Sequence, residues 1–219
     1  MSGLPTLTTR HLTLRPLDPS LDTEPILSLG RDPEVSRFLN DGRPMSCTDV
    51  EEFLERHLTQ YPAGRGFAAV IERETGAFAG WAGVQVPRRW MAKVVDCPLD
   101  PETVEVGWTL VPESRGNGYA TEAADAWIDH GFGTLGLTEI IAVHDPANTA
   151  SERVMNRLGM ARRDSLTLND GDTLCLRALD AGAWSLRARA HVALGYDRGA
   201  VGKSNPRTSG TPTESGATS

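Results

Sequence analysis

The chain has little cysteine and no apolar run long enough to cross a membrane. Its three cysteines, Cys47, Cys97 and Cys175, lie far apart, and none belongs to a CxxC pair. Such usage indicates neither a disulfide framework nor a zinc site, so no metal is expected. The first residues also lack the apolar core of a signal peptide. These absences predict a cytoplasmic protein that does not enter a membrane.

Basic residues are in the minority, with 22 Lys and Arg against 29 Asp and Glu and a formal net charge of −7. A surface that binds nucleic acid is normally basic, so this balance argues against nucleic acid as a partner. It does not argue against a small phosphorylated ligand, which needs only a local group of donors. A length of 219 residues with 39% hydrophobic content is typical of one globular domain.

The hydrophobic pattern predicts a mixed α/β or α+β domain with one central sheet. Strands are expected at residues 11–15, 67–72, 78–86, 104–111, 139–143, 160–168 and 173–178. Helices are expected at residues 23–29, after Asp32-Pro33, after a capping box of Thr48 and Glu51, and at residues 119–132 and 149–158. His57 falls on the apolar stripe of the third helix, which favours a packed core histidine. Residues 87–101 are expected to form a loop whose basic patch fits either a solvated loop or one wall of a ligand site; the patch contains Arg88, Arg89, Trp90 and Lys93.

The domain is expected to span residues 1–196, with a core at about 9–180 and an extra helix at about 181–194. Asp180 is a candidate cap for that helix and Trp184 its anchor. Residues 197–219 are rich in Gly, Ser, Thr and Pro and nearly free of large apolar side chains. Such a segment cannot bury enough surface to offset its ordering entropy, so a disordered tail is expected.

The most informative segment is VEVGWTLVPESRGNGYATEAA, residues 104–124. A strand pattern ends in a glycine turn that begins with Arg115, and an alanine-rich helix follows. Backbone N–H groups and a helix N-terminus then point at one place, which suits a pyrophosphate. The P-loop is excluded because the turn has no lysine. The dinucleotide fingerprint GxGxxG matches only in part, since Thr121 replaces its third glycine, with Asp145 as its candidate acidic partner.

A third pattern, Arg/Gln-x-x-Gly-x-Gly/Ala, fits the turn in full. On these residues the segment resembles the acyl-CoA-binding motif of the GNAT superfamily of N-acetyltransferases. Glycines would let the backbone approach a pyrophosphate, and the arginine would add a charged donor. The resemblance implies that acetyl-CoA is bound by Thr109, Leu110, Val111, Arg115, Gly116, Asn117, Gly118, Tyr119, Ala120, Thr121 and Asn148.

The resemblance covers residues 9–180. Asn148-x-x-Ser151 with Gly159-Met160 is similar to the family's next motif, and residues 9–16 with Asp32-Pro33 resemble the branch of ribosomal-protein N-terminal acetyltransferases and their small-amine relatives. It implies a mostly antiparallel sheet flanked by helices, with a V-shaped splay between the fourth and fifth strands. It also implies an amine acceptor and a homodimer.

Two residues are candidates for the chemistry. Glu105 lies opposite in phase to Val104, Val106 and Trp108, so it would face the substrate cleft if those three face a core helix. It is then a candidate general base, although a structural strand carboxylate fits equally well. The tyrosine that many family members use to protonate the leaving thiolate is replaced by Met155, which leaves Ser151 as the donor.

Ser151 and Asn148 fit structural roles too, because a first-turn serine can satisfy a helix N–H and an asparagine can cap the helix. The backbone N–H groups of Thr109 to Val111 would polarise the thioester. Two other functions stay open: a non-catalytic acyl-CoA sensor, suggested by Met155, and a nucleotide-binding oxidoreductase, suggested by the partial fingerprint.

Overall fold

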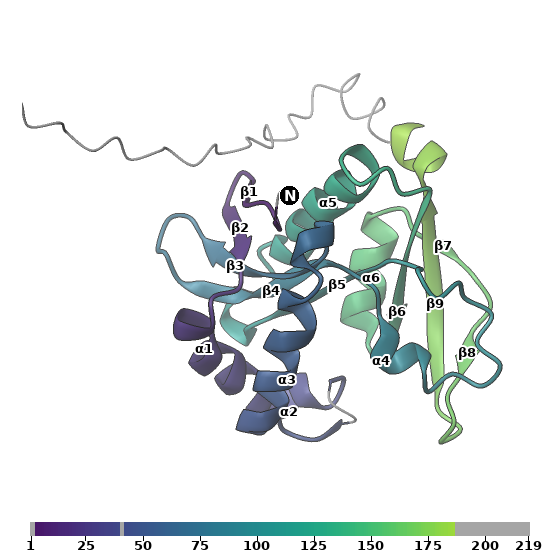
Figure 1. The fold of residues 1–219 in the computed structure, drawn as a ribbon, viewed down its shortest axis with the longest axis horizontal. Coiled ribbons are helices and arrows are strands. Elements are labelled where there is room, and N and C mark those ends of the chain that lie inside the picture. The colour runs from purple at the N-terminus through teal and green to yellow at the C-terminus, as the bar shows by residue number, and fades with distance from the viewer. Residues whose placement is uncertain (1–2, 40–41, 187–219) are drawn as a thin grey trace, which may run out of the picture.

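One sheet organises the fold of this protein in the computed structural model, which describes residues 3–39 and 42–186 (Figure 1). Within that part of the chain the strand order is β1-β2-β3-β4-β5-β6-β9-β7, and β8 pairs with β9. The strands are β1 (Leu7–Thr8), β2 (Leu12–Pro16), β3 (Gly66–Glu72), β4 (Phe78–Gln85), β5 (Glu105–Leu110), β6 (Glu139–His144), β7 (Ala161–Arg162), β8 (Leu166–Thr167) and β9 (Thr173–Asp180).

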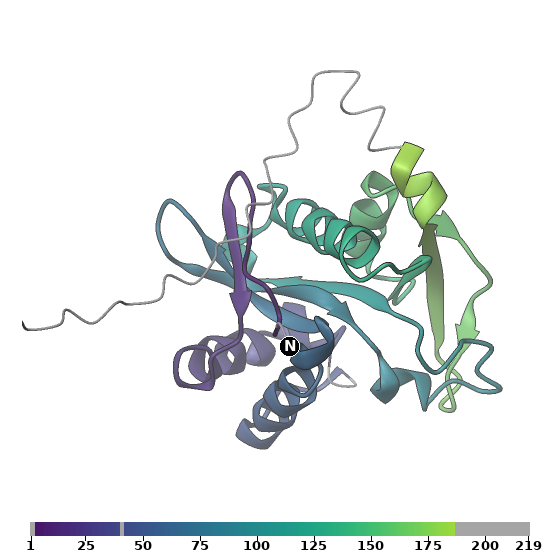
Figure 2. The same ribbon diagram turned by 45° about the horizontal axis from the view of Figure 1, so that its top comes forward.

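Helices cover both faces of this sheet, as Figure 2 shows. One layer contains α1 (Pro19–Arg31), α2 (Pro33–Ser36) and α3 (Cys47–Leu58); the other contains α5 (Tyr119–Gly133) and α6 (Thr149–Arg157). Each layer has its own core. The α5 side buries Trp127, Ile128 and Leu158 with β2, β4 and β5, and the α1–α3 side buries Ile26 and Phe53 with β3 and β4.

Among the described strands the pairs are antiparallel with one exception, the parallel pair of β5 and β6. That pair has a single Cα partnership, Glu105 with Ile141, beside an Ile141 N–H bond of 2.9 Å to the Val104 carbonyl. Beyond Glu105 the two strands separate, which confirms the expected mixed sheet with a splay. The dinucleotide-binding alternative is wrong, because that fold requires a mostly parallel sheet.

Several local predictions are confirmed. Asp32 caps α2 through its side chain, Asn148 caps α6 by accepting from the Ser151 N–H, and Gly159 ends that helix with a φ of 74°. His57 is 1% exposed and its Nδ1 accepts from the Phe67 N–H, so it is a packed core histidine. The Trp184 indole donates to Asp129, as befits an anchor.

Other boundaries differ from the sequence expectation. The capping box of α3 belongs to Ser46 and Asp49 instead of Thr48 and Glu51, so the helix starts earlier than expected. Helix α1 spans Pro19–Arg31, earlier and longer than expected, because the Asp18 side chain caps it. Pro19 occupies the first turn, and the helix continues through Pro25. The expected loop at residues 87–101 contains a short helix, α4 (Arg88–Met91). β1 was not predicted, since two residues carry no periodic signal.

The last helix begins after Asp180, whose Oδ1 accepts from the Ala183 N–H at 2.8 Å. Its expected end and the expected disordered tail lie outside the described residues. Within the described ranges, no helix combines the length and apolar character that a bilayer crossing needs.

Candidate active site

A cavity of about 1020 Å³ lies where β5 leaves β6. It reaches both helical layers, since α3 and α4 line it on one side and the starts of α5 and α6 on the other. The only open route between the two faces of a hydrogen-bonded sheet is a place where strands part. The splay therefore allows two reactants to approach each other from opposite faces.

The glycine turn forms an uncapped helix N-terminus on the α5 side. Gly116 and Gly118 have φ values of 83° and 82°, which favour glycine. Gly118 is the N-cap of α5, and because glycine has no side chain it cannot accept a hydrogen bond from the helix. The first N–H groups of α5 therefore lack the capping partner that a Ser or Asp would supply. Space around both glycines is open, because an added Cβ would meet nothing within 4 Å. This geometry suits an anion.

The side chains around this turn hold it in place. Arg115 Nε lies 3.4 Å from the Leu110 carbonyl, so the arginine folds back along the end of β5. Tyr119 is buried and its hydroxyl donates to Glu72 on β3, which anchors the first turn of α5 to the sheet. The Thr121 hydroxyl is buried and has no hydrogen-bond partner among the described residues. All three residues line the cavity, together with Gly116, Gly118 and Ala120.

Glu105 lies on the opposite face of the sheet from α5. Val104 and Val106 pack in the α5 core, whereas Gly107 approaches Phe67 of the α3-side core so closely that an added Cβ would lie 2.8 Å from its ring. Side chains alternate along a strand, so Glu105 shares the face of Gly107. The orientation inferred from the phase of the strand is confirmed, and Glu105 lines the cavity from the α3 side.

The Glu105 carboxyl is 7% exposed and sits in a polar cage. Its Oε2 accepts from the Trp90 indole at 2.9 Å and from the Gln85 amide at 3.3 Å, and the Val143 N–H also donates to the carboxyl. Burial raises the pKa of Glu105 to about 7, while these hydrogen bonds oppose the rise. A carboxyl with a pKa near neutrality can take up and release a proton under ordinary conditions.

The backbone donors at the end of β5 divide into two sets. The Val111 N–H donates to the Ala79 carbonyl of β4 at 3.0 Å, so it is not available to a ligand, and the expectation for that N–H is wrong. In an antiparallel pair the N–H groups alternate, so Thr109 faces β4 as Val111 does. Trp108 and Leu110 point their N–H groups toward the splay. Of the three expected donors, Thr109 to Val111, the structure therefore leaves the Leu110 N–H facing the splay.

The start of α6 borders the cavity with Asn148 and Ser151. The Asn148 side-chain oxygen accepts a hydrogen bond from the Ser151 N–H at 3.1 Å, so Asn148 caps the N-terminus of α6. The Ser151 hydroxyl forms no hydrogen bond with another described residue, so it stays a candidate donor. Met155 is 2% exposed and packs in the α5 core. Nearby, His144 donates from Nδ1 to the Asp145 carbonyl, and its buried Nε2 has no partner in the described part of the chain.

The sequence indicated only in part the wall opposite the phosphate turn. Arg89 and Trp90 of α4 belong to the basic patch that fitted either a solvated loop or the wall of a ligand site, whereas Gln85 at the end of β4 was not proposed. The notable density of cations at residues 88–93 was the only available signal. It could not be separated from an ordinary solvated loop without knowing that α4 folds over Glu105.

The comparisons with known proteins agree with this geometry. The family model described as an acetyltransferase (GNAT) domain matches residues 11–161. The FsC-acetyl coenzyme A-N(2)-transacetylase of Aspergillus fumigatus is 30% identical over 177 residues, which are 77% of this chain and 70% of that protein. The uncharacterized N-acetyltransferase p20 of Bacillus licheniformis is 26% identical over 85% of this chain and 98% of its own length.

Solved structures share the fold. An acetyltransferase from Agrobacterium tumefaciens superposes with a TM-score of 0.66 at 29% identity, covering 82% of this chain and 96% of that one. The spermidine N-acetyltransferase of Vibrio cholerae, in complex with CoA and spermine, has a TM-score of 0.61 at 15% identity and covers 80% of this chain and 98% of its own. At that identity the second likeness shows the fold alone.

Proposed function

The chain belongs to the GNAT acetyltransferase family, and from that premise we propose that it moves an acetyl group from acetyl-CoA to a primary amine by direct transfer in a ternary complex. The acceptor would be a small-molecule amine or a peptide N-terminus. The observation that carries the proposal is the shared cavity: the uncapped start of α5 and the buried carboxyl of Glu105 border it from opposite faces of the sheet.

On the cofactor side, the N–H groups of residues 116–121 and the Arg115 guanidinium would hold the pyrophosphate. The N-terminus of α5 supports this role because its dipole and free donors favour negative charge. The Thr121 hydroxyl, buried without a partner in the described chain, is a further donor for the same ligand. The Asn148 amide nitrogen is a candidate for a contact with the pantetheine arm.

Glu105 would act as the general base for the amine. A lysine-type amine has a pKa of about 10.4 and is mostly protonated near neutral pH, so it must lose a proton before it attacks. The cage of Trp90 and Gln85 fixes the carboxyl at the splay, and its pKa of about 7 suits uptake of that proton. Holding both reactants together would supply much of the rate in addition to this base.

The thioester carbonyl would be polarised by the Leu110 N–H, which faces the splay. The departing thiolate would receive a hydrogen bond from the Ser151 hydroxyl, since Met155 occupies the place where many relatives carry a tyrosine. Among the groups that line this end of the cavity, Ser151 is the hydroxyl nearest in sequence to that position.

A second candidate function is an acyl-CoA sensor without turnover, and Met155 is the observation that favours it. A buried thioether cannot donate a proton to the leaving group. Both functions predict that acetyl-CoA raises the melting temperature, by an amount that corresponds to about 2.7 kcal/mol at a ligand concentration of ~100 Kd. Only turnover separates them.

The deciding experiment measures free thiol released from acetyl-CoA with a panel of amines and short peptides. Thiol release that depends on the amine, with acetylated product seen by mass spectrometry, supports the transferase. Binding of acetyl-CoA without thiol release for any amine of the panel would instead support the acyl-CoA sensor. Loss of both binding and release in Arg115→Ala would tie the activity to the glycine turn.

A further inference from the structure

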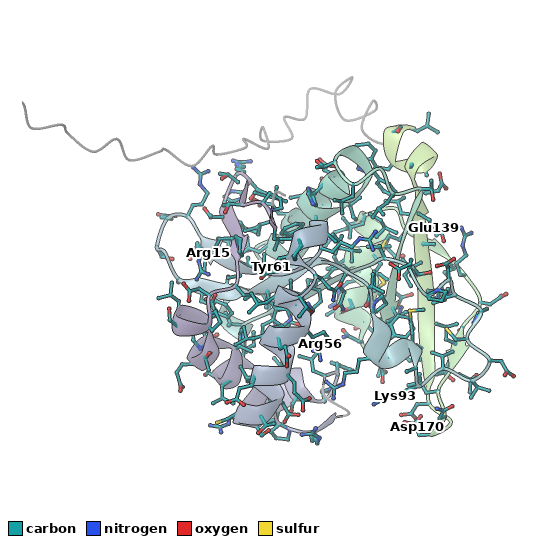
Figure 3. All side chains as sticks on the ribbon, viewed as in Figure 1. Arg15, Arg56, Tyr61, Lys93, Glu139 and Asp170 are labelled. Atoms are coloured by element: carbon teal, nitrogen blue, oxygen red, sulfur yellow. The ribbon has the colours of Figure 1, made fainter. Side chains whose placement is uncertain are left out.

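The wall of the cavity formed by α3, α4 and the residues after α4 is rich in positive charge. Arg56 of α3, Arg89 of α4 and Lys93 after α4 all line it. Figure 3 places Arg56 at the edge of α3 toward α4, with Lys93 beyond α4 on the same side of the molecule. Seven basic and five acidic residues line the cavity as a whole, whereas the full chain carries 22 basic and 29 acidic ones. The lining therefore reverses the sign of the chain's overall charge.

Arg56 is the residue that needs explanation. Its side chain is half-buried and lies 5.7 Å from the centroid of the Phe53 ring, and no carboxylate of the described residues lies within the 4 Å of an ion pair. Burial and the nearby charge of Arg89 both lower the pKa of Arg56, and the exposed Glu52 one turn earlier on α3 opposes them with a smaller effect. A guanidinium removed from water next to a like charge costs free energy, unless an anion joins it.

Within the described chain no carboxylate forms a direct ion pair with Arg56, since Glu52 acts on it only as a nearby charge. Glu34, Asp170 and Asp172 line the same cavity from α2 and the β8–β9 turn, yet none forms an ion pair with Arg56. Glu105 is occupied by Trp90 and Gln85. A carboxylate of a ligand could therefore take the place of a direct ion-pair partner at Arg56.

We propose that the acceptor is an amine whose side chain carries a carboxylate, as an acidic amino acid or an acidic peptide N-terminus does, and that Arg56 binds this side-chain carboxylate while the amine lies near Glu105. The inference rests on the proposed acetyl transfer and names its substrate class. A guanidinium matches a carboxylate with two parallel hydrogen bonds. A polyamine would instead bring positive charge against Arg56 and Arg89, which is unfavourable.

The test compares glutamate with glutamine as acceptors, because the two differ in one charge and hardly in size. Wild-type protein is expected to show the higher kcat/KM for glutamate, chiefly through a lower KM. Arg56→Gln should reduce kcat/KM for glutamate by about tenfold or more, as expected for one lost charged hydrogen bond, and leave glutamine unchanged. The same pair at the first position of a short peptide distinguishes a free amino acid from a peptide N-terminus.

Two further variants make the result specific. Arg56→Lys should restore part of the preference for glutamate, because the charge returns without the planar fork. Arg31→Gln removes an exposed arginine from the end of α1 and should change neither acceptor. Melting temperature and its shift with acetyl-CoA should match the wild type in Arg56→Gln, which separates lost acceptor binding from lost folding.

The possible failures are distinguishable. Equal use of glutamate and glutamine, or a preference for spermidine, would overturn the acceptor assignment while acetyl transfer stands. An unchanged glutamate preference in Arg56→Gln would also overturn it. If acetyl-CoA binds and no amine releases thiol, transfer itself is refuted and the acceptor assignment falls with it.

Discussion

Replacement of Glu105 by Gln should make the stability of this protein depend less on pH. The carboxyl is 7% exposed and its pKa in the folded protein is about 7, against an ordinary value of 4.5. Glutamine has nearly the same shape and keeps an acceptor oxygen for the Trp90 indole. The substitution therefore removes the titration and preserves most of the packing.

The direction follows from proton binding. Below pH 4.5 the carboxyl is protonated in the folded and unfolded states, so it has no effect on the pH dependence. Between pH 4.5 and about 7 the folded state keeps a proton that the unfolded state has released, so the free energy of unfolding falls as pH rises. Above pH 7 the loss is complete and amounts to about 3 kcal/mol, from about 1.36 kcal/mol for each pH unit between the two pKa values.

Urea denaturation at several pH values from 4.5 to 8 measures this effect. The unfolding free energy of Glu105→Gln minus that of the wild type should rise by about 3 kcal/mol across the range. Glu55→Gln, at an exposed position of α3, reports the general effect of removing one negative charge. If the difference in unfolding free energy between Glu105→Gln and the wild type stays constant with pH, Glu105 does not have a raised pKa in the folded protein.

Activity provides a second readout of the same residue. If Glu105 is the general base, kcat/KM rises with pH through about 7, and Glu105→Gln loses this dependence together with about 10²–10⁴-fold of the rate. Retention of the rise in the variant would assign the base to another group and leave Glu105 a structural carboxylate.

Three further changes test the site and the fold. Trp90→Phe removes the indole donor that lowers the pKa of Glu105, so the acid limb of the pH–rate profile should move to higher pH. An unmoved limb would contradict the hydrogen bond from Trp90 to the titrating carboxyl. Gly118→Val forces a branched side chain to a φ of 82° at the start of α5 and should abolish the melting shift with acetyl-CoA, whereas Gly136→Val, at a φ of 67° away from the cavity, should cost similar stability and keep the shift. Asp22→Asn weakens a 1% exposed carboxylate that accepts two bonds of 2.7 Å from Arg15, so urea denaturation should show a loss of about 3–5 kcal/mol, and a loss under about 1 kcal/mol would contradict a buried pair.

Most of the fold was readable from local patterns. The strand–turn–helix of residues 104–133, the Asn148 cap and the Gly159 stop are each fixed by a few neighbouring residues, because capping and positive φ are local requirements. The capping box of α3 was misplaced because Ser46 and Thr48 both suit an N-cap. Ser46 is the cap in the structure, and its N3 partner Asp49 also accepts two hydrogen bonds from Arg43.

The sequence by itself determined the glycine turn that we propose for the cofactor. Arg115, the two glycines and the helix after them are contiguous, so their chemistry is visible without knowledge of the fold. It also determined that Glu105 faces away from α5, since strand alternation is a local rule.

Only the tertiary structure decided what surrounds that carboxyl and which backbone donors stay free. Trp90 and Gln85 reach the Glu105 carboxyl from two elements that are distant from β5 in the chain, and burial in the folded protein raises its pKa although their hydrogen bonds oppose the rise. The Val111 N–H is lost to Ala79 through a pairing register that no single strand encodes. Long-range packing sets these properties, because desolvation and strand pairing depend on every neighbour at once.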